Sequence, residues 1–324
     1  MQSAFADEAA LLRWIRELFP NEGEPRIAVR VEYRSFHHKM ELLRVSFGSD
    51  GAAPFVDLFL RTYLGELCWW VLAEPEIPER ERMAWSAVAR GGVPIPGVQG
   101  WCRTDSGAAA LLEAVPGRGL WYQCTPLAVA DAARVLARLH GLQLEDDEQL
   151  RFPRVGVVDL IERWRGWFEG EEDEQTRAAL EVVCESLDKA MCRPPALLHG
   201  DCHAGNFLSD GRKIVAVLDW ESCAVGDPRL DLAVMDGCLR RWNSDELADS
   251  FLQEYEKTAG WTVADLRPWK DFLDIRDVVV ARWIERRIEA EQDLPPTRPE
   301  AWLKYGHRAR ERLAGILARH APGA

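Results

Sequence analysis

The sequence predicts an α+β protein of two lobes, with a small antiparallel β-rich lobe over residues 1–115 and a larger helical lobe over residues 116–324. Three observations favour this class. The chain has 324 residues, which is enough for two hydrophobic cores. Strand-like runs separated by short turns fill the first third, and helical periodicity dominates the rest. Pro116-Gly117 interrupts the chain where the pattern changes, so we expect a hinge near residues 112–118.

Composition argues against a membrane or disordered protein. Apolar residues make up 47% and charged residues 29% of the chain, as in globular domains. The longest wholly apolar run, Leu67–Ala73, is far shorter than the ~20 residues that span a bilayer, so no membrane association is expected. The acidic N-terminus lacks the basic and apolar regions of a signal peptide, which predicts a cytoplasmic protein.

Charge further limits the partners. Lys and Arg total 40 against 53 Asp and Glu, a formal net charge of −13. Such a surface repels phosphate backbones, so no nucleic acid partner is expected. The same excess of acid weakly favours a cationic small molecule, such as an aminated sugar or an amino alcohol.

The eight cysteines do not indicate a metal or redox site. No Cys-x-x-Cys pair occurs, and the run from His199 through Cys202 to His203 fits no common zinc spacing. Cys202 also follows Asp201, whose negative charge opposes formation of a thiolate nucleophile. We therefore expect reduced, mostly buried thiols.

Patterning of the first lobe predicts strands framed by helices. Apolar spacing indicates helices over Glu8–Phe19 and Pro78–Arg90. Alternating runs with turn residues between them predict three strands of an antiparallel meander and a fourth strand further along: Ile27–Phe36, Met40–Phe47, Phe55–Tyr63 and Ala108–Val115.

The second lobe is predicted to be mainly helical. Thr125 is expected to cap a helix that has Pro126 in its first turn and runs to His140. Asp227 precedes Pro228 and is interpreted as a further helix cap rather than a site residue. The remaining predicted helices are Val157–Phe168, Thr176–Met191, Asp227–Trp242, Ser244–Thr258, Val263–Glu291 and Pro299–Arg319.

The chemistry concentrates in residues 197–221. Apolar runs Phe207–Ser209 and Ile214–Leu218 flank an Asp-Gly turn and should form a hairpin. That pairing folds Asp219 back beside the loop that contains Asp201 and Asn206. Two carboxylates and an amide at one strand end are natural ligands for Mg²⁺, which also takes phosphate oxygens and water. Phosphoryl transfer needs such a set, because the protein mainly positions groups and offsets charge.

Several motifs of this chain resemble those of the aminoglycoside phosphotransferase and choline kinase family, within the protein-kinase-like fold. The specific ones are His199-Gly-Asp-x-x-x-x-Asn206, Leu218-Asp-Trp-Glu221 and Gly226-Asp-Pro-x-x-Asp-Leu-Ala233. The match extends to Gly92-Val-Pro-Ile-Pro96, Leu112-Glu-Ala-Val-Pro-Gly117 and Leu136-Ala-Arg-Leu-His140.

The resemblance implies a role for each matching residue. Asp201 would be the catalytic base, and Asn206 and Asp219 would be the Mg²⁺ ligands. His199 and Asp231 would hold the catalytic loop in shape. ATP or GTP would be the phosphate donor, and a hydroxyl of a small molecule the acceptor.

The nucleotide-binding part departs from the family pattern. Glu81 falls where a helix glutamate pairs with a strand lysine that reaches the nucleotide phosphates, but the strand residue here is Arg61. The family's glycine-rich phosphate loop is replaced by Ser35-Phe-His-His-Lys39. Lys39, His38 or Ser35 is expected to take over the phosphate contact.

Two other functions stay open at this point. A Ser/Thr protein kinase of the bacterial stress-kinase type has a nearly identical His-Gly-Asp-Cys-His run, but the short stretch from Asp219 to Asp227 leaves little room for an activation loop. A nucleotide-binding pseudokinase or scaffold would explain the altered phosphate loop, but it gives no chemical reason to keep Asp201, Asn206 and Asp219 together. Both antibiotic resistance and ordinary metabolism fit the resemblance.

Two further features are interpreted conservatively. The 14 tryptophans, among them the pairs Trp69-Trp70 and Trp164 with Trp167, are assigned to the core rather than to stacking on a substrate. The acidic runs Glu145–Glu148 and Glu169–Glu174 are assigned to solvated surface rather than to a cationic substrate.

Overall fold

The computed structural model forms two compact units. One unit comprises residues 1–85 and 95–116, and the other comprises residues 86–94 and 117–324. The sequence-based division at residue 115 assigned 86–94 to the first lobe, whereas these residues belong to the second unit. The residues that the structure describes are 5, 7–34, 39–48, 54–64, 76–104, 107–145, 148, 151–155, 173–190, 195–290 and 299–320.

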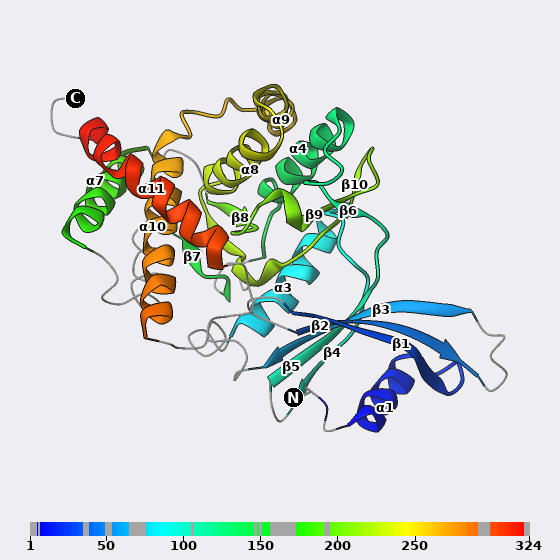
Figure 1. Ribbon diagram of the computed structural model, residues 1–324. Coiled ribbons are helices and arrows are strands. Elements are labelled where there is room, and N and C mark those ends of the chain that lie inside the picture. Colours follow the sequence, from blue (N-terminus) through cyan, green and yellow to red (C-terminus); the bar gives the residue numbers. More distant parts are fainter. Residues whose placement is uncertain are drawn as a thin grey trace. The chain divides into compact units, whose positions relative to one another are not determined.

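The first unit is built on a five-stranded antiparallel sheet (Figure 1). Its strand order is β1-β2-β3-β5-β4, in which the first three strands form the predicted meander. The strands are β1 (Pro25–Arg34), β2 (Lys39–Phe47), β3 (Phe55–Leu64), β4 (Val98–Thr104) and β5 (Gly107–Glu113). Strand β4 was not predicted from the sequence, because the prolines and glycines just before and within it are typical of loops.

Helices α1 (Glu8–Leu18) and α3 (Ile77–Arg90) correspond to the two helices that the sequence predicts before residue 115. Asp7 caps α1 by accepting a hydrogen bond from the Ala10 N–H at 2.7 Å. The apolar stripe of α1 packs on alternate residues of the strands in one cluster, which includes Leu11, Ile15, Leu43, Val45, Leu58, Leu60, Ala109 and Leu111. The other face of β3 carries Arg61 and Tyr63, which contact Glu81 of α3.

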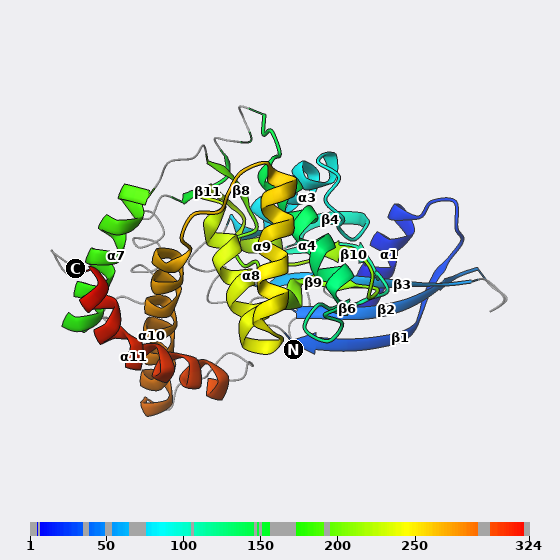
Figure 2. The same cartoon turned by 90° about the horizontal axis from the view of Figure 1, so that it is seen from above.

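The second unit is mainly helical, as predicted. Helix α4 (Pro126–His140) contacts α9 (Asp245–Ala259), which in turn contacts α8 (Arg229–Trp242). A second group, α7 (Glu174–Ala190), α10 (Arg267–Glu289) and α11 (Pro299–His320), packs together in both views (Figures 1 and 2). The predicted helix over 157–168 lies outside the described residues, as do Trp69, Trp70, Trp164 and Trp167.

Two three-stranded sheets in this unit position the motif-bearing loops. One has the order β10-β9-β6, with β6 (Arg118–Gly119), β9 (Phe207–Ser209) and β10 (Ile214–Val217). The other has the order β7-β11-β8, with β7 (Arg154–Val155), β8 (Ala196–Leu198) and β11 (Ala224–Gly226). The β9–β10 pair is the predicted hairpin, with Gly211 of its turn at φ +90°. Because β11 pairs antiparallel with β8, the two ends of the segment that joins these strands lie side by side.

Candidate active site

The loop 199–206 joins β8 to β9 and is held by Asp231 of α8. Asp231 is fully buried, and its carboxylate accepts hydrogen bonds from the backbone N–H groups of His199 at 2.7 Å and Gly200 at 3.0 Å. A buried carboxylate that receives two backbone donors fixes both peptides. This is the arrangement that the predicted supporting role of Asp231 requires.

His199 connects this loop to the chain just before Asp219. Its Nε2 donates to the Leu218 carbonyl at 2.8 Å, and its Nδ1 accepts from the Asp201 N–H at 3.2 Å. These two partners require a neutral imidazole with the proton on Nε2. The buried ring, which lies against Trp220 with ring centroids 4.7 Å apart, therefore bridges the two segments that carry the predicted base and metal ligand.

Gly200 permits a close approach between the same two segments. It has φ +81°, and an added Cβ would lie 2.0 Å from the Ser222 carbonyl oxygen. A residue with a side chain would be strained at this φ and would also push the two segments apart.

Asp201 and Asn206 lie at opposite ends of this loop but contact each other. Asn206 Nδ2 donates to the Asp201 carbonyl at 3.0 Å, and the Asn206 carbonyl accepts from the Leu218 N–H at 2.8 Å. Asn206 is buried, whereas the Asp201 side chain is 42% exposed and therefore accessible to a substrate. The chain thus brings Asp201, Asn206 and the residue before Asp219 into one cluster.

Asp219 adopts a strained backbone conformation. It lies between β10 and a short 3₁₀ helix (Trp220–Ser222) with φ 67° and ψ 65°, and is the one non-glycine residue with positive φ in the described part of the chain. A left-handed conformation costs a non-glycine residue of order 1–3 kcal/mol, and such strain is often found at functional sites.

The donor set fits Mg²⁺ better than a transition metal. Asp201, Asn206 and Asp219 offer only oxygen donors, and Mg²⁺ usually takes one or two carboxylates and completes its shell with phosphate and water. Within the described residues, no group of three or more His, Cys, Asp or Glu side chains could hold a metal by itself. Cys202 is fully buried, and that burial raises the pKa of its thiol well above its usual value, which opposes zinc ligation and nucleophilic attack.

The predicted ion pair of the first unit is present and buried. Arg61 Nε lies 3.0 Å from Glu81 Oε2, and the two side chains are 5% and 1% exposed. Tyr63, two residues along the same strand face, accepts a hydrogen bond from Arg61 at 3.0 Å and donates one to Glu81. The arginine therefore keeps the strand-to-helix pairing that the resemblance implies for a lysine. Contact with a nucleotide remains a prediction.

Lys39 is engaged within the sheet. Its Nζ lies 3.1 Å from Glu32 and 3.3 Å from Glu41, and its side chain is 11% exposed. Glu41 is itself buried and also accepts from Arg30. A phosphate would compete with these two carboxylates for the ammonium group, and the phosphate contact of Lys39 stays a prediction. Ser35 and His38 lie outside the described residues.

Asp227 acts as a structural residue at the start of α8. Its carboxylate accepts from the Arg229 N–H at 2.9 Å and forms a buried ion pair with the Arg229 guanidinium. The N-cap position of α8 is Pro228 and not Asp227 as the sequence suggested, but Asp227 is a structural residue whose carboxylate binds the first residue of the helix. The buried Arg229 partner had no sequence signal.

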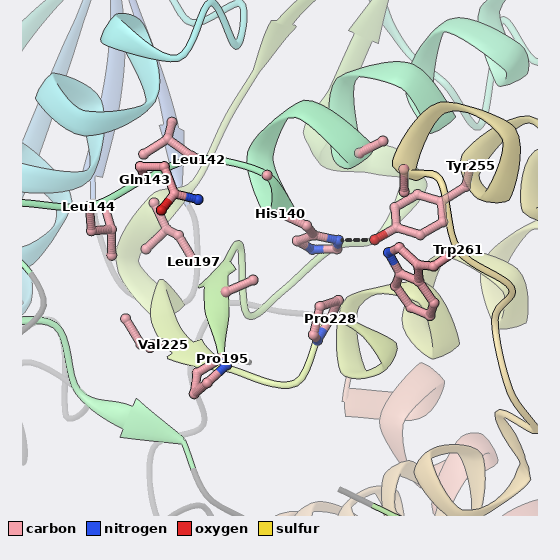
Figure 3. Close-up of a pocket in the computed structure, with 14 residues that line it drawn as sticks. His140, Leu142, Gln143, Leu144, Pro195, Leu197, Val225, Pro228, Tyr255 and Trp261 are labelled. Atoms are coloured by element: carbon pink, nitrogen blue, oxygen red, sulfur yellow. Dashed lines mark hydrogen bonds between the residues drawn. The ribbon is translucent and has the colours of Figure 1, made fainter. Parts of the chain in front are cut away.

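His140 and Tyr255 extend the support of the loop into a neighbouring pocket. His140 Nε2 lies 3.2 Å from Asp231 Oδ2, and its Nδ1 lies 2.7 Å from the Tyr255 hydroxyl. Figure 3 shows these two rings at a pocket of about 550 Å³, which Trp261, Leu142 and Pro228 also line. His140 lies in a motif shared with the family, whereas Tyr255 had no sequence signal, because it comes from a helix without any recognised motif.

Comparison with known proteins places the chain in a family. The model of the phosphotransferase enzyme family matches residues 44–269, well over half of the chain. The chain belongs to this family. The sequence-based predictions of the family and of the enzyme class are therefore confirmed.

Related sequences agree with this assignment. The chain is 30% identical over 202 residues to an aminoglycoside 3'-phosphotransferase of Streptomyces fradiae, with 55% of this chain and 71% of that protein covered. It is 25% identical over 182 residues to an aminoglycoside 3'-phosphotransferase of Escherichia coli, with 50% and 64% covered. It also matches the mouse acyl-CoA dehydrogenase family member 10 with 26% identity, where 60% of this chain corresponds to only 20% of that protein.

Solved structures confirm the predicted fold. A putative aminoglycoside phosphotransferase from Ralstonia eutropha JMP134 superposes with a TM-score of 0.67 at 20% identity, covering 97% of this chain and 98% of the other. A choline/ethanolamine kinase family protein from Mesorhizobium loti gives a TM-score of 0.57 at 17% identity, covering 90% and 91%. At these identities the likeness establishes the fold alone.

No helix in the described part of the chain combines the length and the apolar character needed to cross a membrane.

Proposed function

We propose that this phosphotransferase is a small-molecule kinase, which transfers the γ-phosphate of ATP to a hydroxyl group with Asp201 as the base. The observation that carries the proposal is the cluster in which His199 and Asp231 hold Asp201 and Asn206 beside the chain that leads into Asp219. Family membership supports the reaction class. Among structures of the same fold is an aminoglycoside phosphotransferase complex with AMP-PNP and hygromycin B.

In this reaction the acceptor oxygen bonds to the γ-phosphorus, the bond from that phosphorus to the bridging oxygen breaks, and ADP leaves. The Asp201 carboxylate orients the acceptor hydroxyl and takes its proton. Its partial exposure suits contact with an acceptor, while the hydrogen bonds on its backbone fix its position.

Asn206 and Asp219 are proposed to hold Mg²⁺. When bound, the ion offsets phosphate charge and orients the triphosphate. The positive φ of Asp219 favours a role as a metal ligand over that of an ordinary surface residue, because backbone strain is often found at functional sites. GTP as the donor and the protein kinase and scaffold alternatives have no comparable support.

The acceptor is proposed to be a cationic molecule with hydroxyl groups, such as an aminated sugar or an amino alcohol. The net charge of −13 favours a cation over an anion. The related aminoglycoside 3'-phosphotransferases of Streptomyces fradiae and Escherichia coli are named for acceptors of this kind.

The base assignment predicts a large effect of Asp201→Asn. We expect turnover to fall by about 10²- to 10⁴-fold, because the amide cannot accept the proton, while Mg-ATP affinity changes little. The measurement is transfer of labelled phosphate from ATP to a panel of aminoglycosides and amino alcohols. Asp210→Asn is the matched control, because Asp210 lies in the exposed β9–β10 turn and an amide oxygen can still accept from Arg212 and Lys213 N–H groups. Equal turnover of Asp201→Asn and wild type would refute the role of Asp201.

A further inference from the structure

His203 lies beside the proposed base with a defined ring orientation. Its Nδ1 accepts a hydrogen bond from the Gly205 N–H at 3.0 Å, so the ring proton must be on Nε2. That nitrogen lies 3.5 Å from Asp201 Oδ2. The Nε2–H group of His203 therefore lies within ion-pair distance of one particular oxygen of the carboxylate.

A second nitrogen lies near the same carboxylate oxygen. Asn206 Nδ2 also lies 3.5 Å from Asp201 Oδ2. Among the described residues, none donates a hydrogen bond to Oδ1, and the Asp201 side chain is 42% exposed. Catalytic contacts are often long without substrate and tighten when it binds. The two nitrogens thus distinguish an anchored oxygen from an accessible one.

Trp121 holds the His203 ring from the other side. The two rings stack with centroids 4.9 Å apart and planes 13° apart. Trp121 reaches this position because β6 pairs with β9. Leu120, which follows β6 and precedes Trp121, donates a hydrogen bond from its N–H to the Phe207 carbonyl at 2.8 Å. A segment remote in sequence therefore supports the catalytic loop.

Gly205 indicates that this stack is built into the loop. An added Cβ at Gly205 would lie 2.8 Å from His203 Cε1 and 3.0 Å from Trp121 Cζ3. The first distance is shorter than real Cβ contacts and the second is tighter than most of them, so a larger residue at this position would have to displace the two rings.

We propose that Trp121 and His203 form a positioning pair, which anchors Asp201 Oδ2 and thereby presents Oδ1 to the acceptor hydroxyl. The role rests on the proposed function. In this arrangement the proton of the hydroxyl passes to Oδ1 as the oxygen–phosphorus bond forms, while the His203 N–H keeps its own proton. The pair acts through Asp201 and needs no contact with the acceptor.

Kinetics of His203→Ala, His203→Gln and Trp121→Ala test this role. We expect His203→Ala and Trp121→Ala to lower kcat by roughly 10- to 100-fold with KM for Mg-ATP unchanged, because a mobile carboxylate is misplaced for the proton transfer. His203→Gln should recover part of kcat, because its amide N–H can reach the same oxygen. The control is Tyr122→Ala, because Tyr122 is the adjacent aromatic residue, its side chain is 79% exposed, and its hydrogen bond to the Gly119 carbonyl is made by the backbone N–H, which alanine keeps.

A second measurement does not depend on activity. The ¹⁵N shifts of the His203 ring in histidine-labelled wild type should report a neutral ring with the proton on Nε2, and Trp121→Ala should alter them. A proton on Nδ1, or a kcat of His203→Ala equal to that of Tyr122→Ala, would overturn the proposal. If the wild type phosphorylates no acceptor, the proposed function fails instead, and the ring tautomer and its response to Trp121→Ala decide whether the pair exists.

Discussion

At the scale of the residue, the hydrogen bonds and backbone angles of the site restrict which amino acid can occupy each position. His199 needs a donor on one ring nitrogen and an acceptor on the other, because it bridges Leu218 and Asp201. Asp219 keeps a positive φ without being glycine. The motif spacing predicted Asp201, Asn206 and Asp219 from sequence, whereas Trp121 and Tyr255 could not be predicted, because only strand pairing and helix packing bring them to the loop.

Gly200→Ala should therefore destabilise the protein and lower turnover. A Cβ at φ +81° that meets the Ser222 carbonyl costs of order 1–3 kcal/mol in strain, and relief of the clash moves the Asp201 loop away from the chain at Asp219. Thermal unfolding and phosphate transfer measure the two effects. Gly237→Ala is the control, because a Cβ there meets nothing within 4 Å. In helix α8 this alanine should add ~0.5–1 kcal/mol. Equal melting temperatures for the two variants would contradict this view of Gly200.

At the scale of the element, strands and helices were predicted well where periodicity was clear. The β9–β10 hairpin followed from two apolar runs and an Asp-Gly turn, and Thr125 caps α4 as predicted. The helix predicted from Ser244 onward is α9, and Ser244 is its N-cap. Strand β4 was missed because its glycine and the prolines before it are typical of loops, and pairing with β5 overrides that local preference. The Arg61–Glu81 pair, predicted by resemblance, depends on the alternation of β3.

Glu81→Gln should reveal the cost of that buried pair. Glu81→Gln removes the carboxylate that lies 3.0 Å from the buried Arg61 guanidinium, and breaking a buried ion pair costs ~3–5 kcal/mol of unfolding free energy. Urea unfolding measures the loss. Glu79→Gln is the control on the same helix, since its exposed pairs with Arg82 and Arg103 contribute only ~0–1 kcal/mol. A change below ~1 kcal/mol for Glu81→Gln would be inconsistent with the buried pair.

At the scale of the whole molecule, the division into a β-rich and a helical part followed from sequence, but its details did not. Residues 86–94 join the second unit although they continue α3 and its following loop. Their assignment depends on contacts such as the hydrogen bond from Val217 N–H to the Pro94 carbonyl, which joins segments far apart in sequence. Such tertiary contacts carry no local pattern.

The central claim is that Asn206 and Asp219, beside Asp201, hold the divalent ion on the nucleotide. Its most direct test is electron paramagnetic resonance of Mn²⁺, used in place of Mg²⁺, titrated with ATP into wild type, Asp219→Ala and Asp210→Ala. We expect ATP-dependent binding of Mn²⁺ by wild type and by Asp210→Ala, and at least a tenfold weaker binding by Asp219→Ala, because a carboxylate ligand is lost. Undiminished Mn²⁺ binding by Asp219→Ala would contradict the account.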